Sequence, residues 1–229
     1  MGKRIIQQAR GHGSMTYRVR RRAYRFEINY PLIEGKGKVI KLINSPAHSA
    51  PLVKILVNKK VFYNPAWDGA IEGQEIEIGK KLGTGNILQL KDIPITTRIF
   101  NIEVRYGDGG KLVRASGSSA IVTKKQNRTV SVLMPSKKEI RFDEKCRATI
   151  GIIAGQGRLD KFIVKAGKKW HMMKARNKLW PRTSAVKMNA IDHPFGSGRG
   201  KRIKSKIAKR NAPPGARVGH IRPSRTGKR

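Results

Sequence analysis

The residues most capable of chemistry in this 229-residue chain lie together in residues 187–200. This stretch places one imidazole, His193, directly after a carboxylate, Asp192, and three of its last five residues are glycines. Glycines let a backbone approach a partner with no side chain in between. Exposed backbone amides and the fork of an arginine, here Arg199, are suited to anionic surfaces. The residue types therefore predict a loop that contacts an anion.

Catalysis by this stretch is not expected. Asp192 and His193 resemble half of a nucleophilic triad, but neighbours in sequence seldom face each other and no positioned serine is evident. A phosphate-binding loop of the Walker type needs Ser or Thr after Gly200-Lys201, where Arg202 stands, and a glycine where Phe195 stands. The sequence also lacks the spacing of zinc ligands. The chain has one cysteine, Cys146, and its histidines are scattered: His12, His48, His171, His193 and His220. We predict no catalytic residue, no metal ligand and no cofactor.

Charge indicates the partner. The chain holds 51 Lys and Arg against 14 Asp and Glu, a formal net charge of +37. Such a chain repels itself when compact and needs a polyanion, which predicts nucleic acid first and an anionic membrane surface second. A membrane-surface protein would need an amphipathic helix or a lipid signal, and neither is evident. No helix-turn-helix or zinc finger is present for a DNA groove, so folded RNA is favoured.

The acid-free ends are a second indication of RNA. Residues 1–26 and 193–229 contain no Asp or Glu, and they lack the apolar content to offset the entropy of ordering. We expect both ends to be disordered alone and to order on a partner. Arg20, Arg21 and Arg22 lie between Tyr17 and Tyr24, as in a segment that contacts RNA. A targeting presequence is the alternative, and the glycines and the arginine run oppose it.

The middle of the chain predicts short strands. Alternation and apolar runs separated by Gly, Pro and Asn recur at about ten-residue spacing, which is typical of small antiparallel barrels. The expected strands are 39–43, 52–57, 60–63, 75–78, 98–104, 120–123, 129–134, 139–142 and 147–153. Residues 35–38 are expected to form a turn, and residues 83–86 the main internal boundary. Cys146 should point inward as a small hydrophobe, and His48 should be structural or solvated.

Beyond residue 155 the strand pattern fades. Residues 160–175 predict a short helix in which Trp170 with Met172 and Met173 forms a hydrophobic plug. After Pro181 no regular element is expected. Glu75 with Glu77, and Asp143 with Glu144, are interpreted as ordinary surface carboxylates.

Seven segments, in order and spacing, resemble the universal large-subunit ribosomal protein family L two, and the match covers nearly the whole chain. They are Gly85-Asn86 with Ile93-Pro94, residues 98–103, 107–112, 114–120, Met134-Pro135-Ser136, 146–151 and 188–196. Residues 210–219 and 225–227 are similar to the archaeal and eukaryotic branch. Two departures stand in the loop. The family's triple glycine is Gly196-Ser197-Gly198 here, and a histidine-bearing segment common after it is replaced by Arg199-Gly200-Lys201-Arg202.

The resemblance implies a mainly β fold, an oligonucleotide-binding-type barrel and then an SH3-like barrel, with long basic irregular extensions at both ends. The expected boundaries are an N-terminal extension at 1–26, the first barrel at 27–84, the second at 85–157, and a C-terminal extension at 158–229. It also implies a cytoplasmic, structural RNA-binding role in the large ribosomal subunit. Expected partners are ribosomal RNA, other ribosomal proteins and the small subunit, and Mg²⁺ enters only as part of the RNA environment.

That role includes subunit association, tRNA binding and support of the peptidyl transferase centre, whose chemistry belongs to RNA. An RNA-binding assembly factor or an RNA-modifying enzyme is the alternative. His193 matches a family histidine linked to peptidyl transfer. It is either a hydrogen-bonding group placed against RNA or a turn histidine that orders its loop. The predicted RNA-binding residues are Arg20, Arg21, Arg22, Lys36, Lys38, Arg114, Lys187, Asn189, His193, Gly196, Gly198, Arg199, Lys201, Arg202, Lys204 and Arg217.

Overall fold

The computed structural model describes residues 2–200, 207–208 and 218–221. The chain divides into two compact units. Residues 21–168 form one unit, which we call the β unit. The described parts of 1–20 and 169–229 form the other, which we call the terminal unit.

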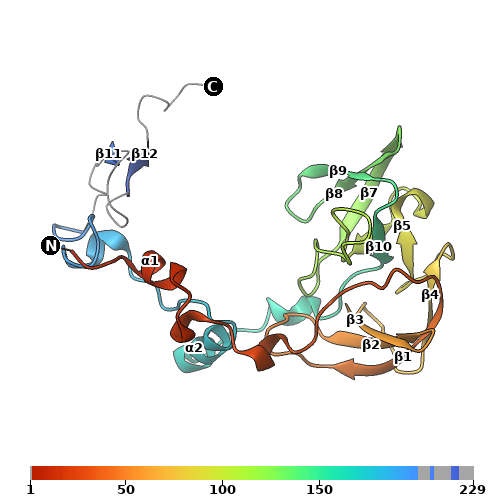
Figure 1. Cartoon of the computed structure of the whole chain (residues 1–229), viewed down its shortest axis with the longest axis horizontal. Coiled ribbons are helices and arrows are strands. Elements are labelled where there is room, and N and C mark those ends of the chain that lie inside the picture. The colour runs from red at the N-terminus through yellow and green to blue at the C-terminus, as the bar shows by residue number, and fades with distance from the viewer. Residues whose placement is uncertain (1, 201–206, 209–217, 222–229) are drawn as a thin grey trace. The chain divides into compact units, whose positions relative to one another are not determined.

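The β unit contains a ten-stranded sheet in the order β3-β2-β1-β4-β5-β10-β6-β7-β8-β9 (Figure 1). Neighbouring strands are antiparallel except for β4 and β5, which are parallel. The strands are β1 Gly35–Ile43, β2 Leu52–Val57, β3 Lys60–Pro65, β4 Glu75–Gly79, β5 Ile87–Gln89, β6 Arg98–Phe100, β7 Ala120–Gln126, β8 Thr129–Leu133, β9 Glu139–Asp143 and β10 Arg147–Ile150. Short 3-10 helices are η2 Arg21–Tyr24, η3 Leu90–Asp92 and η4 Gln156–Arg158.

The prediction of a mainly β chain is confirmed. Closure of each half into a barrel, and the domain boundaries, stay predictions. The expected division at residue 84 falls between β4 and β5, where Ile78 lies opposite Ile87 and Gly79 opposite Leu88. The two halves therefore share one sheet. Figure 1 shows β1, β2 and β3 at one end of the β unit and β7, β8 and β9 at the other.

The turn expected at residues 35–38 is wrong, because these residues begin β1. Gly37 pairs with Val57 on one side and with Ile76 on the other. A Cβ added at Gly37 would lie 2.3 Å from a methyl of Val57. The glycine is there because two neighbouring strands crowd the backbone, and this steric need looks like a turn signal when only the sequence is read.

The strand expected at residues 98–104 is also too long. β6 ends at Phe100, because the buried Asn101 adopts a left-handed conformation with φ of +48°. Asparagine tolerates this region better than most residues, since its short polar side chain forms local hydrogen bonds. The chain turns at Asn101, and Glu103, two residues later, is completely buried.

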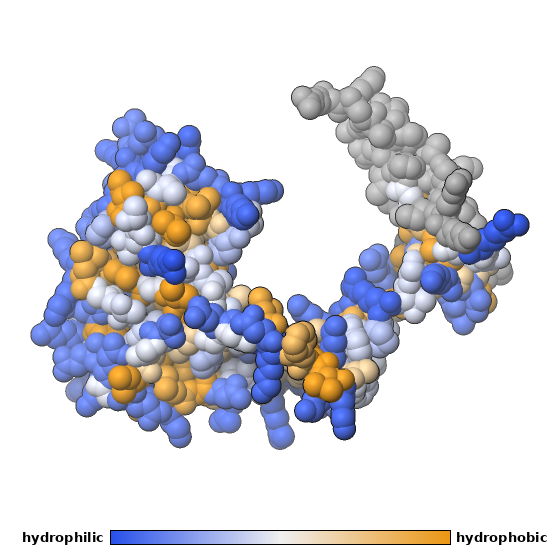
Figure 2. All heavy atoms as spheres, turned by 180° about the vertical axis from the view of Figure 1, so that it is seen from behind, coloured by the Kyte–Doolittle hydropathy of each residue, from blue (hydrophilic) through white to orange (hydrophobic). Residues whose placement is uncertain are grey.

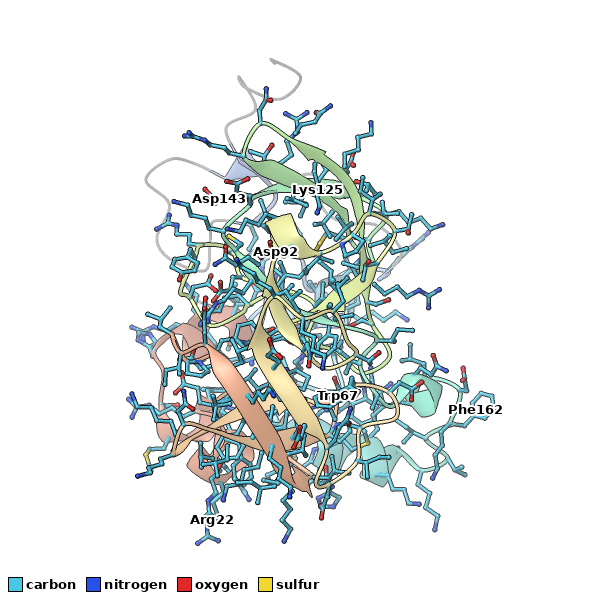
Figure 3. All side chains as sticks on the ribbon, turned by 90° about the vertical axis from the view of Figure 1, so that its right-hand side faces the viewer. Arg22, Trp67, Asp92, Lys125, Asp143 and Phe162 are labelled. Atoms are coloured by element: carbon cyan, nitrogen blue, oxygen red, sulfur yellow. The ribbon has the colours of Figure 1, made fainter. Side chains whose placement is uncertain are left out.

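Two apolar clusters fill the β unit. The first centres on Trp67 and the residues of β1 to β4, and it also takes in Ile87, Phe100 and Ile153 from the second half. The second is built around β5 to β10 and includes Cys146, which is fully buried as expected. Figure 3 shows Trp67 among the side chains between the strands, with Arg22 at the edge of the unit.

A buried polar network joins the two halves. The Tyr30 hydroxyl donates to the Asn101 carbonyl at 2.7 Å and lies 2.6 Å from the Thr149 hydroxyl. Asn64 Nδ2 donates to the same Thr149 oxygen at 3.0 Å, and Asn101 Nδ2 donates to Asn64 Oδ1 at 2.8 Å. Burial raises the pKa of Tyr30 above its usual range, so its proton stays available for these bonds.

Beside the network lies a buried ion pair. Arg147 donates from Nη2 to Glu103 Oε1 at 2.6 Å, and its own backbone N–H donates to Glu103 Oε2 at 2.8 Å. The two side chains are only 7% and 0% exposed. Arg147 Nη1 also donates to the Pro31 carbonyl at 2.6 Å, so the pair ties the segment before β1 to β10.

The terminal unit contains α1 Ile6–Gly11, η1 Met15–Tyr17, most of α2 Ala166–Ala175 and η5 Ala185–Lys187. Two short parallel strands, β11 Ile207–Ala208 and β12 His220–Ile221, also belong to it. The expectation of no regular element after Pro181 is wrong on these points. The helix expected from residue 160 begins at Ala166. None of its residues is buried, so Trp170 and Met172 do not form a plug within this chain. No described helix is long and apolar enough to cross a membrane.

Glu103→Gln should destabilise the β unit by about 3–5 kcal/mol, because it leaves the buried Arg147 guanidinium without a counter-charge. Urea unfolding of the full chain, followed by tryptophan fluorescence, measures this change. Glu75→Gln makes the same chemical change at an exposed position of β4 and should shift stability by less than about 0.5 kcal/mol. Equal midpoints for the two variants would contradict the role given to the ion pair.

Cys146 should resist alkylation in the folded protein. Burial raises the pKa of its thiol to about 11, so at pH 8 the group is protonated as well as inaccessible. Iodoacetamide should modify it slowly in buffer and rapidly in denaturant, with mass spectrometry counting one adduct because the chain has one cysteine. Equal rates in both conditions would show that this cluster opens readily.

Candidate nucleic-acid interface

Backbone hydrogen bonds close the stretch 187–200 into a compact loop after η5. The Asp192 amide donates to the Asn189 carbonyl at 3.0 Å, and the Gly196 amide donates to the His193 carbonyl at 2.8 Å. The Ser197 amide then returns to the Met188 carbonyl at 3.0 Å, which joins the two ends of the loop. The loop therefore has a defined shape before any partner is present.

Gly196 has an internal role. It is buried, and a Cβ added there would lie 2.2 Å from the Asn189 carbonyl oxygen. Any larger residue would force the two sides of the loop apart. From the sequence, we expected this glycine to leave the backbone open to a partner. In the structure, it allows the two sides of the loop to pack closely against each other.

The exit of the loop is the open part. Ser197, Gly198 and Gly200 have φ of +63°, +136° and +67°. No described atom lies within 4 Å of a Cβ built on Gly198. The amides of Gly198, Arg199 and Gly200 donate no backbone hydrogen bond to the described residues, so this exit, with the exposed Arg199, can face an anion.

His193 is oriented by its own loop. The Phe195 amide donates to His193 Nδ1 at 3.0 Å, and the two rings lie 5.1 Å apart. Because Nδ1 accepts this bond, the neutral ring carries its proton on Nε2. The half-buried imidazole lines a cavity of about 230 Å³ together with residues of the N-terminal segment, among them Ile5 and Arg10.

The Asp192 carboxylate pairs with Lys3 rather than with His193. It lies 3.6 Å from the Lys3 ammonium, and the Lys3 amide donates to the Ile191 carbonyl at 2.8 Å. The first residues of the chain thus hold the loop in place. Sequence reasoning missed Lys3, whose only signal was an isolated carboxylate in a region otherwise full of cations.

Most of the predicted RNA-binding residues that the structure describes are exposed. The exposed ones include Arg20, Arg22, Lys36, Lys38, Lys187, Asn189 and Arg199. Arg21 belongs to η2. Figure 2 shows hydrophilic side chains around most of the visible rim of the β unit. The predicted residues Lys201, Arg202, Lys204 and Arg217 lie outside the described residues.

Arg114 points inward. Its guanidinium donates to Asn101 Oδ1 at 2.8 Å, to the Ile28 carbonyl at 3.0 Å and to the Gly110 carbonyl. Burial lowers the pKa of Arg114 from its usual value. The described geometry commits this side chain to the polar network of the β unit. Its predicted contact with RNA stays a prediction.

Metal chemistry has no support in the described part of the chain, where no three His, Cys, Asp or Glu side chains gather as a metal site. His48 is structural, as expected. Its Nδ1 lies 2.8 Å from the Ser45 hydroxyl and its ring packs edge-on against Tyr24.

Comparison with known proteins decides the family. Residues 83–215 match the family described as Ribosomal Proteins L2, C-terminal domain. Large ribosomal subunit protein uL2 of Archaeoglobus fulgidus is 43% identical over 238 aligned residues, covering 100% of both chains. The same protein of Methanococcoides burtonii is 44% identical with the same coverage. That of Hyperthermus butylicus is 42% identical, covering 100% of this chain and 99% of its own.

The chain belongs to the uL2 family. The resemblance to its archaeal-type branch is confirmed. As a uL2 protein the chain is a structural component of the large, cytoplasmic ribosomal subunit, together with ribosomal RNA and other ribosomal proteins. The compact loop, its open exit and the exposed cations are therefore parts of a ribosomal protein.

The uL2 identity gives a context to Ser197. This residue stands at the middle position of the family's triple glycine and still adopts φ of +63°. The left-handed backbone is thus present without the glycine. A non-glycine residue held there costs about 1–3 kcal/mol and persists only when the surrounding structure fixes it. The hydrogen bond from the Ser197 amide to the Met188 carbonyl helps to fix it.

Gly196→Ala should disrupt the loop and reduce incorporation of the chain into large subunits several-fold, because the added methyl meets the Asn189 carbonyl. Gly167→Ala is the matched control, since it lies in α2 with no described atom within 4 Å of its added methyl. The ratio of tagged variant to a second ribosomal protein in gradient-purified subunits measures the effect. Equal incorporation of the two variants would remove the packing role of Gly196.

Proposed function

We propose that the chain binds large-subunit ribosomal RNA with the open exit of its loop and with its exposed cations. The phosphate ligands would include Arg20, Arg22, Lys36, Lys38 and Lys187. Arg21, Lys201, Arg202, Lys204 and Arg217 join them on sequence grounds. Each neutralised phosphate releases counterions, so affinity should fall steeply with salt. The net charge of +37 supports a polyanion as the partner.

The same binding would support subunit association, tRNA binding and the organisation of the peptidyl transferase centre. Contact with the small subunit is part of this proposal. The relatives are named as proteins of the large ribosomal subunit, and that name supports the ribosomal setting. No cofactor is proposed, and Mg²⁺ would enter only with the RNA.

The orientation of His193 supports a structural role, rather than a catalytic one, for the loop. Its Nδ1 is occupied by the Phe195 amide, and Asp192, the carboxylate next to it in sequence, pairs with Lys3 instead. The ring therefore lacks the carboxylate partner of a proton relay. It keeps Nε2–H as a hydrogen-bond donor toward the RNA. His193 thus orders the loop and also presents a donor, and no catalytic role for the protein is proposed.

His193→Gln should retain peptide-bond formation in reconstituted large subunits, because glutamine keeps both a donor and an acceptor. His193→Ala removes both and should weaken protection of the RNA against chemical probes. Puromycin reactivity and RNA footprints of the two subunit preparations measure these effects. If His193→Gln abolishes peptide-bond formation while assembly and footprints stay intact, the structural role of His193 is wrong.

A further inference from the structure

A second cavity in the terminal unit lies between η1 and the residues that follow α2. Its volume is about 180 Å³, below the roughly 300–1,000 Å³ of pockets for drug-sized ligands. The space suits one flat ring system better than a whole cofactor. Its lining comes from residues 10–17 and 170–180 and includes Arg10, Trp170, Lys174, Asn177, Lys178 and Trp180.

The backbone at one side of the cavity is fixed. Asn177 follows α2 in a left-handed conformation with φ of +49°. The Lys178 amide donates to the Met173 carbonyl at 2.8 Å, which closes the helix end. Arg10 Nη2 donates to the Asn177 carbonyl at 3.0 Å, so α1 holds the same turn.

Aromatic rings and cations surround the space. Lys174 Nζ lies 4.4 Å from the centre of the Trp170 ring, and Lys169 Nζ lies 5.2 Å from that of Trp180. Trp170 is 39% exposed. No carboxylate occurs among the described residues that line the cavity. Aromatic faces beside cations are the combination that stacks nucleobases and binds their phosphates.

One polar atom at the cavity lacks a partner. Asn177 Nδ2 is buried and makes no hydrogen bond to the described residues. A buried donor left unpaired costs about 1–3 kcal/mol, so such atoms in native proteins need an explanation. A ligand with an acceptor on its edge would satisfy it once the side chains that cover this atom move aside.

We propose that this cavity receives one unpaired nucleobase of the ribosomal RNA. The base stacks on Trp170 or Trp180, a ring nitrogen or carbonyl oxygen accepts the Asn177 amide proton, and Lys174 and Lys178 bind the flanking phosphates. This assignment rests on the proposed RNA binding and adds a recognition site away from the loop at 187–200. It is favoured over an acidic peptide because a peptide carboxylate would use the cations and leave the aromatic faces unused.

The test uses the full chain and protein-free large-subunit RNA, probed with reagents that modify unpaired bases. The wild-type chain should protect at least one unpaired base, and at least one of the variants Trp170→Leu and Trp180→Leu should restore its reactivity. That variant should also weaken binding about 5- to 150-fold, which corresponds to about 1–3 kcal/mol of stacking per base. Phe162→Leu is the matched control, because Phe162, labelled in Figure 3, is 89% exposed and is not among the residues that line the cavity.

Salt dependence separates stacking from phosphate contacts. The tryptophan variants should keep the slope of log affinity against log salt, whereas Lys174→Gln should lower its magnitude by about 0.7. Asn177→Asp keeps a residue that tolerates the left-handed turn and replaces the amide donor with an acceptor. It should restore base reactivity even if a tryptophan variant fails to fold.

The outcomes are distinguishable. If the wild-type chain does not bind the RNA, the proposed function is wrong. If it binds and protects the RNA but no base regains reactivity in the Trp170, Trp180 or Asn177 variants, the cavity assignment alone is overturned. Loss of a neighbouring ribosomal protein from subunits, with unchanged base reactivity, would assign the cavity to a protein partner and also overturn it.

Discussion

The buried pair of Glu103 and Arg147 is the contact on which the β unit depends. A charge buried without a partner is costly, and the cost is offset only when both groups and their hydrogen bonds are in place. Here Glu103 follows the left-handed turn at Asn101, and Arg147 begins the central strand β10. The same guanidinium reaches the Pro31 carbonyl. One ion pair thus fixes the end of β6, the start of β10 and the chain that leads into β1.

This use of a carboxylate is informative because the chain has only 14 of them against 51 cations. Glu103 holds the fold from inside, and Asp192 holds the loop through Lys3. Arg114 is likewise turned inward and bonded to carbonyl and amide oxygens. The other described cations lie largely on the surface, where the proposed contact with RNA would offset their mutual repulsion. On this proposal, the charges that build the fold are separate from the charges that meet the partner.

Sequence patterns predicted the parts of the fold that alternation controls. β4 and β8 alternate between buried and less buried residues, and both were predicted nearly in full. The patterns failed where a single backbone conformation or a distant neighbour decides. Strand β1 has a glycine at position 37 because Val57 leaves no room there for a Cβ. Glu103 is buried two residues after the chain turns at Asn101. In the loop, the sequence singled out His193 and Gly196. It could not show that the Phe195 amide donates to the His193 ring, or that the Asn189 carbonyl packs against Gly196.

The terminal unit joins residues from opposite ends of the chain, and this sets an order during synthesis. Lys3 meets Ile191 and Asp192, and Arg10 meets Asn177. Residues 21–168 form their own compact unit and can fold while the ribosome is still translating the later residues. The first residues must wait until residue 192 has been made. The His193 loop is therefore completed only after the β unit has been synthesised, and a chain released before residue 192 would carry a folded sheet without the closed loop.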